Sequence, residues 1–372
     1  MRLPPADVDS PQPGPPWQRA VAQLEAAAGS MQARATVLDR DGQFPEDDMA
    51  LLRSLGLLVA PLPRSMGGWG TGTEPDGADA LLAILRAIGR GNLALGRLYE
   101  AHVNALKLIV DYGAAGQAEA AAQDARSGRL FGVWVTDPPG GGLSVRDGRL
   151  VGSKGPCSGA GHVAAAVVTL ETAEGARMAV LRLDGTEQVQ PAQGTLQGMR
   201  GSVNGWVAFD GIPLAADSLV GQPGDYLREP QLSTGAWRTS AVTLGGLDAL
   251  VAEVGRQLRG KRHDGSPLQQ ERFGRLLIAQ ETAALWTGSA ARCAEAGTAP
   301  VADQVAYVNL ARIAVEQCCL DALHLAQRSI GLGAFVVGTL LERLARDLSV
   351  YLRQPAPDAV LTEAAQHGLM KA

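Results

Sequence analysis

The sequence predicts an α+β protein in which an N-terminal helical domain, a middle antiparallel β domain and a C-terminal helical bundle follow one another. Apolar residues recur first at helix-face spacing, then in short β-branched segments separated by Gly, Asp or Pro, and finally at helix-face spacing again. Because strands do not alternate with helices, this order disfavours a doubly wound nucleotide-binding sheet. The expected divisions are a disordered tail at 1–16, helices at 17–128, the β domain at 129–222 and the bundle at 223–372.

Composition narrows the class of protein. The 372 residues carry 33 basic and 38 acidic side chains, a net charge of -5, and no basic block, so nucleic acid is not an expected partner. Mean hydropathy is +0.02, and the apolar runs fall short of the ~20 residues that cross a bilayer, so no membrane association is expected. Gly and Ala are abundant while aromatic residues make up only 4%, which favours closely packed helices and tight turns.

The cysteines and the N-terminus indicate a cytoplasmic protein. Four cysteines include the adjacent pair Cys318 and Cys319, and none has CxxC spacing. The N-terminal segment contains prolines where a signal peptide has an apolar run. Cys319 and His324 fall on different sides of a helix, so small-residue packing is expected there and a metal site is not.

The first helical region contains a cluster of polar residues, Glu100, His102 and Asn104, that could transfer protons. A helix is expected to begin at Pro45, because three acidic residues follow it at the positive end of the helix dipole. Further along, Glu100 and Asn104 are four residues apart and share a helix face, while His102 points to a different side. A carboxylate, an amide and an imidazole so close in sequence are candidates for proton transfer, although a structural histidine is the simpler interpretation of His102.

The middle region is expected to form an antiparallel meander with a hairpin turn at Asp147-Gly148. Gly159-Ala160-Gly161-His162-Val163-Ala164 matches the GxGxxA dinucleotide fingerprint, but β-rich sequence follows it where a phosphate-binding helix should begin. In the last region, Gly331 and Gly333 follow a long helical stripe. They let backbone N–H groups approach a phosphate or simply form a helix C-cap, and both interpretations remain open.

In this order and spacing, the local sequences resemble the acyl-CoA dehydrogenase family from about Asp39 to Asp347. The resemblance is carried by the following segments: Phe44-Pro45 with the glycine turn at 67–70, Val133-Trp134-Val135-Thr136-Asp137-Pro138, Ser158-Gly159-Ala160, Gly198-Met199-Arg200-Gly201-Ser202, Gln327 with Gly331-Leu332-Gly333, and Glu342-Arg343 with Arg346-Asp347.

The resemblance implies a flavoprotein oxidoreductase with FAD between the β domain and the bundle and a neighbouring subunit that completes the site. It implies an acyl substrate, possibly a CoA thioester, a homodimer or homotetramer, and electron-transfer flavoprotein as a possible partner. The cofactor-binding residues carried over are Trp134, Val135, Thr136, Ser158, Arg262, Gln327, Gly331 and Gly333. Arg262 lies in a charged turn, Lys261 to Gly265, where the family's aromatic residue is absent.

The family's catalytic carboxylate is missing from this sequence. Its chemistry uses a glutamate to remove the proton next to a thioester carbonyl while hydride leaves for the flavin. The equivalent stretch is Arg353-Gln354-Pro355-Ala356-Pro357-Asp358, and the alternative position before Arg238 holds Trp237. Asp358, Glu100 and His102 are therefore the candidate catalytic residues. A flavin monooxygenase on the same fold and a flavin-binding protein without turnover are the alternative functions.

Overall fold

The computed structural model describes residues 14–191 and 196–372, so residues 1–13 of the expected tail lie outside the described residues. The first helical region contains α1 (Pro16–Leu38), α2 (Glu46–Ser54), α3 (Ala78–Gly91), α4 (Leu93–Tyr112) and α5 (Ala115–Arg126). The strands are β1 (Phe131–Trp134), β2 (Ser144–Arg146), β3 (Arg149–Val151), β4 (Ser153–Cys157), β5 (Ala165–Thr172), β6 (Gly175–Arg182), β7 (Gln188–Pro191), β8 (Gly205–Ala208) and β9 (Leu219–Val220). The second helical region contains α6 (Gln231–Thr234), α7 (Ala236–Gly260), α8 (Pro267–Ala296), α9 (Val301–Ile330), α10 (Leu340–Tyr351) and α11 (Pro357–Lys371).

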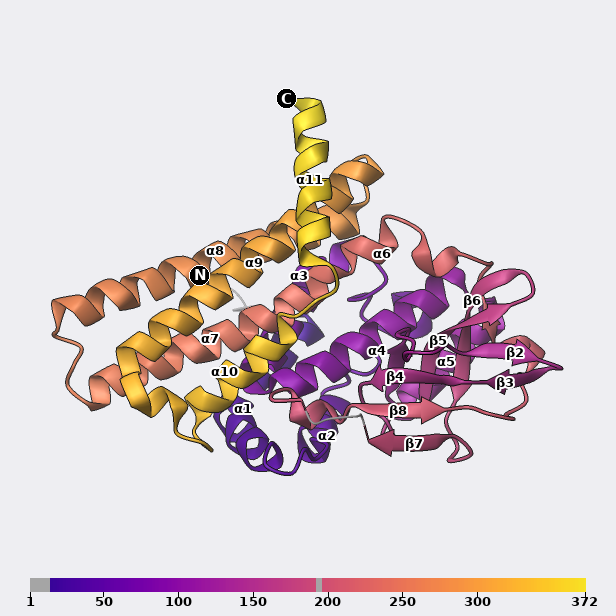
Figure 1. Cartoon of the computed structure of the whole chain (residues 1–372), viewed down its shortest axis with the longest axis horizontal. Coiled ribbons are helices and arrows are strands. Elements are labelled where there is room, and N and C mark those ends of the chain that lie inside the picture. Colours follow the sequence, from indigo (N-terminus) through magenta and orange to yellow (C-terminus); the bar gives the residue numbers. More distant parts are fainter. Residues whose placement is uncertain (1–13, 192–195) are drawn as a thin grey trace, which may run out of the picture.

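This element order confirms the predicted fold class of helices, β domain and helical bundle. The helix expected at Pro45 is also present, since α2 begins at Glu46 and places three acids in its first turn. Figure 1 shows the strands gathered at one end of the molecule and the turn between α7 and α8 at the opposite end, with α11 projecting from the bundle. The domain boundaries after residues 128 and 222 stay predictions.

The β domain consists of two sheets, which corrects the expectation of a simple meander. In the larger sheet the order is β3-β2-β5-β6-β9, with β1 paired to β5, and in the smaller sheet it is β4-β8-β7. The hairpin at Asp147-Gly148 is confirmed, and both residues have positive φ. However, β1 runs parallel to β5, with Phe131 opposite Ala165. A parallel neighbour requires a long connection, and residues 135–164 supply it.

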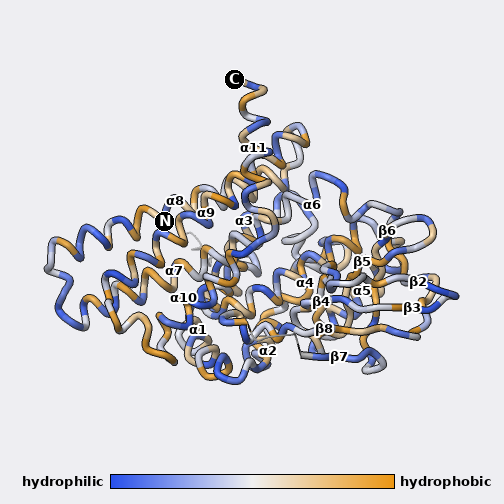
Figure 2. The backbone as a smooth tube through the Cα atoms, viewed as in Figure 1, coloured by the Kyte–Doolittle hydropathy of each residue, from blue (hydrophilic) through white to orange (hydrophobic). Residues whose placement is uncertain are grey.

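Glycines allow α3 and α7 to pack closely, as the composition predicts. A Cβ added to Gly89 would lie 2.2 Å from the Val242 carbonyl oxygen, and one added to Gly245 would lie 2.1 Å from the Arg86 carbonyl oxygen. No larger residue fits between these two helices without moving a backbone. The contact fixes α7 beside the first helical region. Figure 2 shows hydrophilic and hydrophobic stretches alternating along α8 and α9, which cover α7 on its other side.

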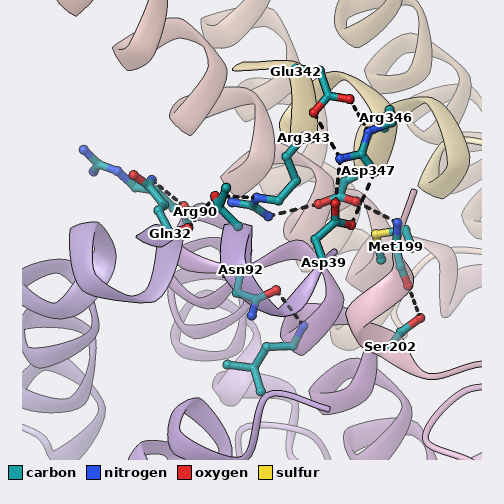
Figure 3. Close-up of polar contacts among 12 residues, drawn as sticks. Gln32, Asp39, Arg90, Asn92, Met199, Ser202, Glu342, Arg343, Arg346 and Asp347 are labelled. Carbon is teal, nitrogen blue, oxygen red and sulfur yellow. Dashed lines mark hydrogen bonds and ion pairs between the residues drawn. The ribbon is translucent and has the colours of Figure 1, made fainter. Parts of the chain in front are cut away.

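A buried ionic network joins α10 to the first helix and to the connection between β7 and β8 (Figure 3). Arg343 donates to Asp347 at 3.0 Å, and Asp347 accepts the backbone N–H of Met199 at 2.7 Å. Arg346 pairs with Asp39 at 2.6 Å, which holds α10 against the end of α1. Burial raises the pKa of Asp347, while the Arg343 charge opposes that shift. These residues are the Gly-Met-Arg-Gly-Ser and Glu-Arg…Arg-Asp segments of the sequence, and their role here is structural.

None of the helices within residues 14–191 and 196–372 is both long enough and apolar enough to cross a membrane.

Candidate active site

A cavity of about 460 Å³ lies where α4, α7, α9 and the segment after α10 meet. Its wall combines apolar surface with a group of polar side chains. The polar side chains that line it include Glu100 and Asn104 from α4, Arg238 from α7, Asn309 and Arg312 from α9, and Gln354 from the segment between α10 and α11. Val133 of β1 also lines this cavity, which therefore reaches the edge of the β domain.

Glu100 is the most enclosed carboxylate of the cavity, with a residue exposure of 5%. One of its oxygens accepts from Asn104 at 2.7 Å, and the other accepts from Arg97 at 3.2 Å. Thr239 and the Tyr351 hydroxyl donate to it over longer distances, each 3.4 Å. Burial, with the nearby Glu100 charge, raises the pKa of Tyr351 well above its ordinary value, so this phenol stays protonated. Glu100 is thus an oriented carboxylate whose two longest contacts are the easiest to exchange for a substrate.

The predicted pairing of Glu100 with Asn104 is present, and it extends to a cation that sequence reasoning did not select. Arg238 donates through Nε to the Asn104 Oδ1 at 2.9 Å and pairs with Glu295 at 3.3 Å. The chain Glu100–Asn104–Arg238 therefore crosses from α4 to α7. It holds both helices' polar groups in fixed positions on one wall of the cavity.

His102 does not share this site with Glu100. Its ring is fully buried on the opposite side of α4, where one nitrogen contacts the Leu58 carbonyl at 2.8 Å and the other accepts the Phe131 N–H at 3.1 Å. Burial lowers the pKa of His102 to about 4, so the ring is neutral at neutral pH. Both ring nitrogens bind backbone groups, so His102 has a structural role and connects α4 to β1.

The two positions where the resemblance leads us to expect a carboxylate hold Gln354 and Trp237, which lack base character. Gln354 lines the cavity and donates to the Tyr351 carbonyl at 2.7 Å. Trp237 is fully buried, and its indole N–H is directed to Glu295. Asp358 is exposed in the first turn of α11 and does not line the cavity. The structure therefore brings only one of the three predicted catalytic residues, Glu100, to the cavity.

The predicted cofactor residues of the β domain lie together at the end of β1. Trp134 is buried and donates its indole N–H to the Ser158 carbonyl at 2.9 Å, while the Ser158 hydroxyl donates to Asn204 at 2.8 Å. Val135 is half-buried and Thr136 is exposed. Within the part of the chain that the structure describes, β1 has β5 as its one ladder partner. Its other edge therefore has backbone donors and acceptors without a sheet partner.

The predicted cofactor residues of the bundle lie at the opposite end of the molecule, near the turn after α7 and the end of α9 (Figure 1). Gly331 has φ +68° and ψ -143°, a conformation that favours glycine, and nothing lies within 4 Å of the position a Cβ would take. The Lys261 ammonium lies 3.7 Å from the corresponding Cβ position of Gly333. Arg262 is exposed in the neighbouring turn, and Gln327 is half-buried one turn before Gly331.

These two groups suit the two ends of a flavin nucleotide. The free edge of β1 with Thr136 offers hydrogen bonds to a flavin ring, and the exposed Gly331 backbone beside Lys261 and Arg262 offers donors and positive charge for phosphate. Within one chain they are not adjacent. One flavin nucleotide would contact both groups only if a second copy of the chain supplied one of them.

Gly331→Ala is expected to weaken flavin retention by at least about tenfold, because a Cβ strains this backbone and would displace the N–H groups that we expect to bind a phosphate. Gly338→Ala is the matched control, since Gly338 has φ +83° and equally open surroundings. Equilibrium dialysis with FAD and FMN, together with thermal unfolding, measures both effects. Equal flavin affinity for the two variants would contradict a phosphate contact at Gly331.

Sequence reasoning missed Arg238, Asn309 and Arg312. In the sequence, Arg238 stands out only as the neighbour of Trp237. Adjacent residues of a helix lie on different faces, so the burial of Trp237 does not indicate where Arg238 points. Asn309 and Arg312 are three residues apart on one face of α9, where a polar pair interrupts an apolar stripe. Polar residues within an apolar stripe were the sequence feature that could have indicated a polar site on this helix.

Comparison with known proteins agrees with this architecture. Residues 19–129 match the family model described as acyl-CoA dehydrogenase, N-terminal domain. Curated protein sequences give no match to the chain. Among solved structures, KijD3 in complex with dTDP is 19% identical with a TM-score of 0.83, covering 97% of this chain and 98% of that chain.

Two further solved structures have similarly low identity and similarly complete coverage. Dibenzothiophene monooxygenase (TdsC) from Paenibacillus sp. A11-2 is 17% identical with a TM-score of 0.83, covering 95% of this chain and 98% of that chain. Butyryl-CoA dehydrogenase from Megasphaera elsdenii is 17% identical with a TM-score of 0.82, covering 99% of this chain and 100% of that chain. Residues 19–129 therefore match the N-terminal domain of acyl-CoA dehydrogenases, and the chain shares its fold with these solved structures over nearly its whole length.

Proposed function

We propose that this protein is a flavin-dependent oxidoreductase that oxidises an acyl or related substrate in the cavity between α4, α7 and α9. The observation that carries the proposal is the position of Glu100, an enclosed carboxylate on the wall of a cavity that reaches β1. A bound flavin supplies a hydride acceptor. The free edge of β1 would hold the flavin ring, and Val133 of that strand lines the same cavity.

In this proposal Glu100 accepts the substrate proton. Asn104 and Arg97 hold the carboxylate in place, while the longer contacts from Thr239 and Tyr351 give way to the substrate. Arg238 fixes the Asn104 amide and is therefore a positioning residue. Asp358 is not part of this arrangement, and His102 contributes by holding α4 against β1.

We further propose FAD as the cofactor and a homodimer or homotetramer as the working form. The separation of the two flavin-binding groups within one chain supports the need for a second copy. Exposed apolar side chains at Leu332, Phe335, Val336 and Val337, next to Gly331, offer a surface for that copy. Electron-transfer flavoprotein is the proposed electron acceptor. The four cysteines are free, in keeping with the reducing conditions of the cytoplasm.

Purification followed by identification of the released flavin and light scattering tests this proposal. We expect FAD, about one per chain, and a mass of two or more chains. Release of FMN would correct the cofactor, as one similar structure is described with FMN and indole. A colourless monomer that takes up neither flavin would contradict the proposed function.

A flavin monooxygenase is the second candidate. It is favoured by Gln354 and Trp237 at the two positions where a catalytic carboxylate is expected, and by the similarity to the Paenibacillus dibenzothiophene monooxygenase. Oxygen consumption with an added flavin reductant and recovery of a hydroxylated or sulfoxidised product would support it. Substrate-dependent flavin reduction without oxygen would support dehydrogenation. A flavin that responds to neither indicates a binding protein without turnover.

A further inference from the structure

Two polar residues of α9, Arg312 and Asn309, line the cavity without a full set of hydrogen-bond or ion-pair partners in the described part of the chain. Both face the cavity from one side of the helix. Neither takes part in the Glu100–Asn104–Arg238 chain described above.

Arg312 differs from the other cations of the cavity in its charge balance. Lys107 pairs with Asp111 at 3.4 Å, and Arg238 pairs with Glu295 at 3.3 Å. Arg312 forms no ion pair within residues 14–191 and 196–372. It donates to the Pro355 carbonyl, and its Nε is buried with no acceptor among the described residues. Burial lowers the pKa of Arg312, and the charge of Glu316, which forms no ion pair with it, only partly opposes that shift.

Asn309 supplies an independent observation. The residue is only 3% exposed, yet it lines the cavity, and its side chain has no hydrogen-bond partner within the described part of the chain. The amide atoms of Asn309 are not enclosed without a partner, so they offer a donor that a molecule in the cavity can reach. Asn309 and Arg312 are three residues apart on α9, so their polar groups present to the same region of the cavity.

We propose that the cavity takes a substrate that bears an anionic group, a carboxylate or a phosphate, and that Arg312 and Asn309 bind that group. This rests on the proposed function only in placing the substrate there. The guanidinium offers N–H donors in a planar arrangement that matches either oxyanion, and the Asn309 amide adds one more donor. With Glu100 on α4 and the anion held on α9, the substrate would span the cavity from one helix to the other.

Isothermal titration calorimetry of the purified, flavin-loaded protein tests the assignment, because it does not depend on turnover. The probes are glutarate as a carboxylate, coenzyme A as a phosphate compound, and 1,5-pentanediol as an uncharged analogue of glutarate. We expect glutarate or coenzyme A, but not the diol, to bind. Whichever anion binds identifies the source of the charge.

The variants are Arg312→Gln, Arg312→Lys and Asn309→Ala, each checked by thermal unfolding. Loss of a charge-assisted hydrogen bond should weaken anion binding about tenfold to a hundredfold in Arg312→Gln and less in the lysine variant. Arg275→Gln is the matched control, since Arg275 pairs with Glu271 outside the cavity and its loss removes the same charge.

Unchanged anion affinity in a folded Arg312→Gln protein would overturn the assignment. So would diol binding as tight as that of the anions, or failure of both anions to bind. Anion binding that depends on Arg312 in a protein whose flavin is never reduced would instead uphold this inference and contradict the proposed reaction.

Discussion

Glu100→Gln is expected to slow substrate-dependent flavin reduction by about 10²- to 10⁴-fold, the usual contribution of a general base. The change keeps the side-chain volume and leaves an acceptor for Asn104, which donates to Glu100 at 2.7 Å. Substrate binding and flavin content should therefore stay close to those of the unchanged protein. Anaerobic stopped-flow measurement of the flavin absorption band, with butyryl-CoA and glutaryl-CoA as substrates, gives the rate.

Two carboxylates serve as controls for this experiment. Asp111 lies on the same helix, lines the same cavity and pairs with Lys107. Asp358 is exposed on α11. Asp111→Asn and Asp358→Asn each remove one negative charge, and we expect little change in the reduction rate from either. A large loss with Asp358→Asn and a normal rate with Glu100→Gln would assign the base to the α11 segment and contradict the role of Glu100.

Arg343→Met is expected to lower the free energy of unfolding by about 3–5 kcal/mol, because it leaves the Asp347 carboxyl group buried without its cation. Both side chains are almost completely enclosed, with exposures of 2% and 3%. The substitution also removes the contact from Arg343 to Thr36, which links α10 to α1. Urea unfolding followed by circular dichroism measures the change.

Arg353→Met is the control for that substitution, since its ion pair with Glu316 is exposed on the arginine side at 57%. Its loss should cost no more than about 1 kcal/mol. The double variant Arg343→Met/Asp347→Leu should regain part of the stability, because neither charge is then left alone. Equal effects of the two arginine substitutions would show that the network in Figure 3 does not stabilise α10.

The order of elements could be predicted from periodicity alone, and local turn chemistry placed the hairpin at Asp147-Gly148. The pairing of β1 with β5 could not be predicted in this way. Residues that pair across a parallel connection are distant in sequence, and nothing in either strand specifies its neighbour. The prediction of a meander followed from sequence proximity, which the long connection from residue 135 to 164 overrides.

The residues of the candidate site also fall into those that local sequence could predict and those that depend on tertiary packing. The i,i+4 relation of Glu100 and Asn104 is a local property of a helix, and the structure contains it. Arg238 and Arg312 join the same cavity from α7 and α9, and their meeting depends on how the bundle packs. His102 was a candidate by residue type, but its burial between the Leu58 carbonyl and the Phe131 N–H is a tertiary property that the sequence does not display.

Anaerobic spectroscopy of the purified protein shows whether this cavity oxidises an acyl thioester. The long-wavelength absorption of the bound flavin is recorded before and after addition of butyryl-CoA, glutaryl-CoA and further acyl thioesters. The account predicts that at least one thioester bleaches the flavin without oxygen and that Glu100→Gln slows the bleaching. A protein that contains flavin but keeps its full absorption with every thioester would contradict the assignment of an acyl-oxidising activity to this cavity.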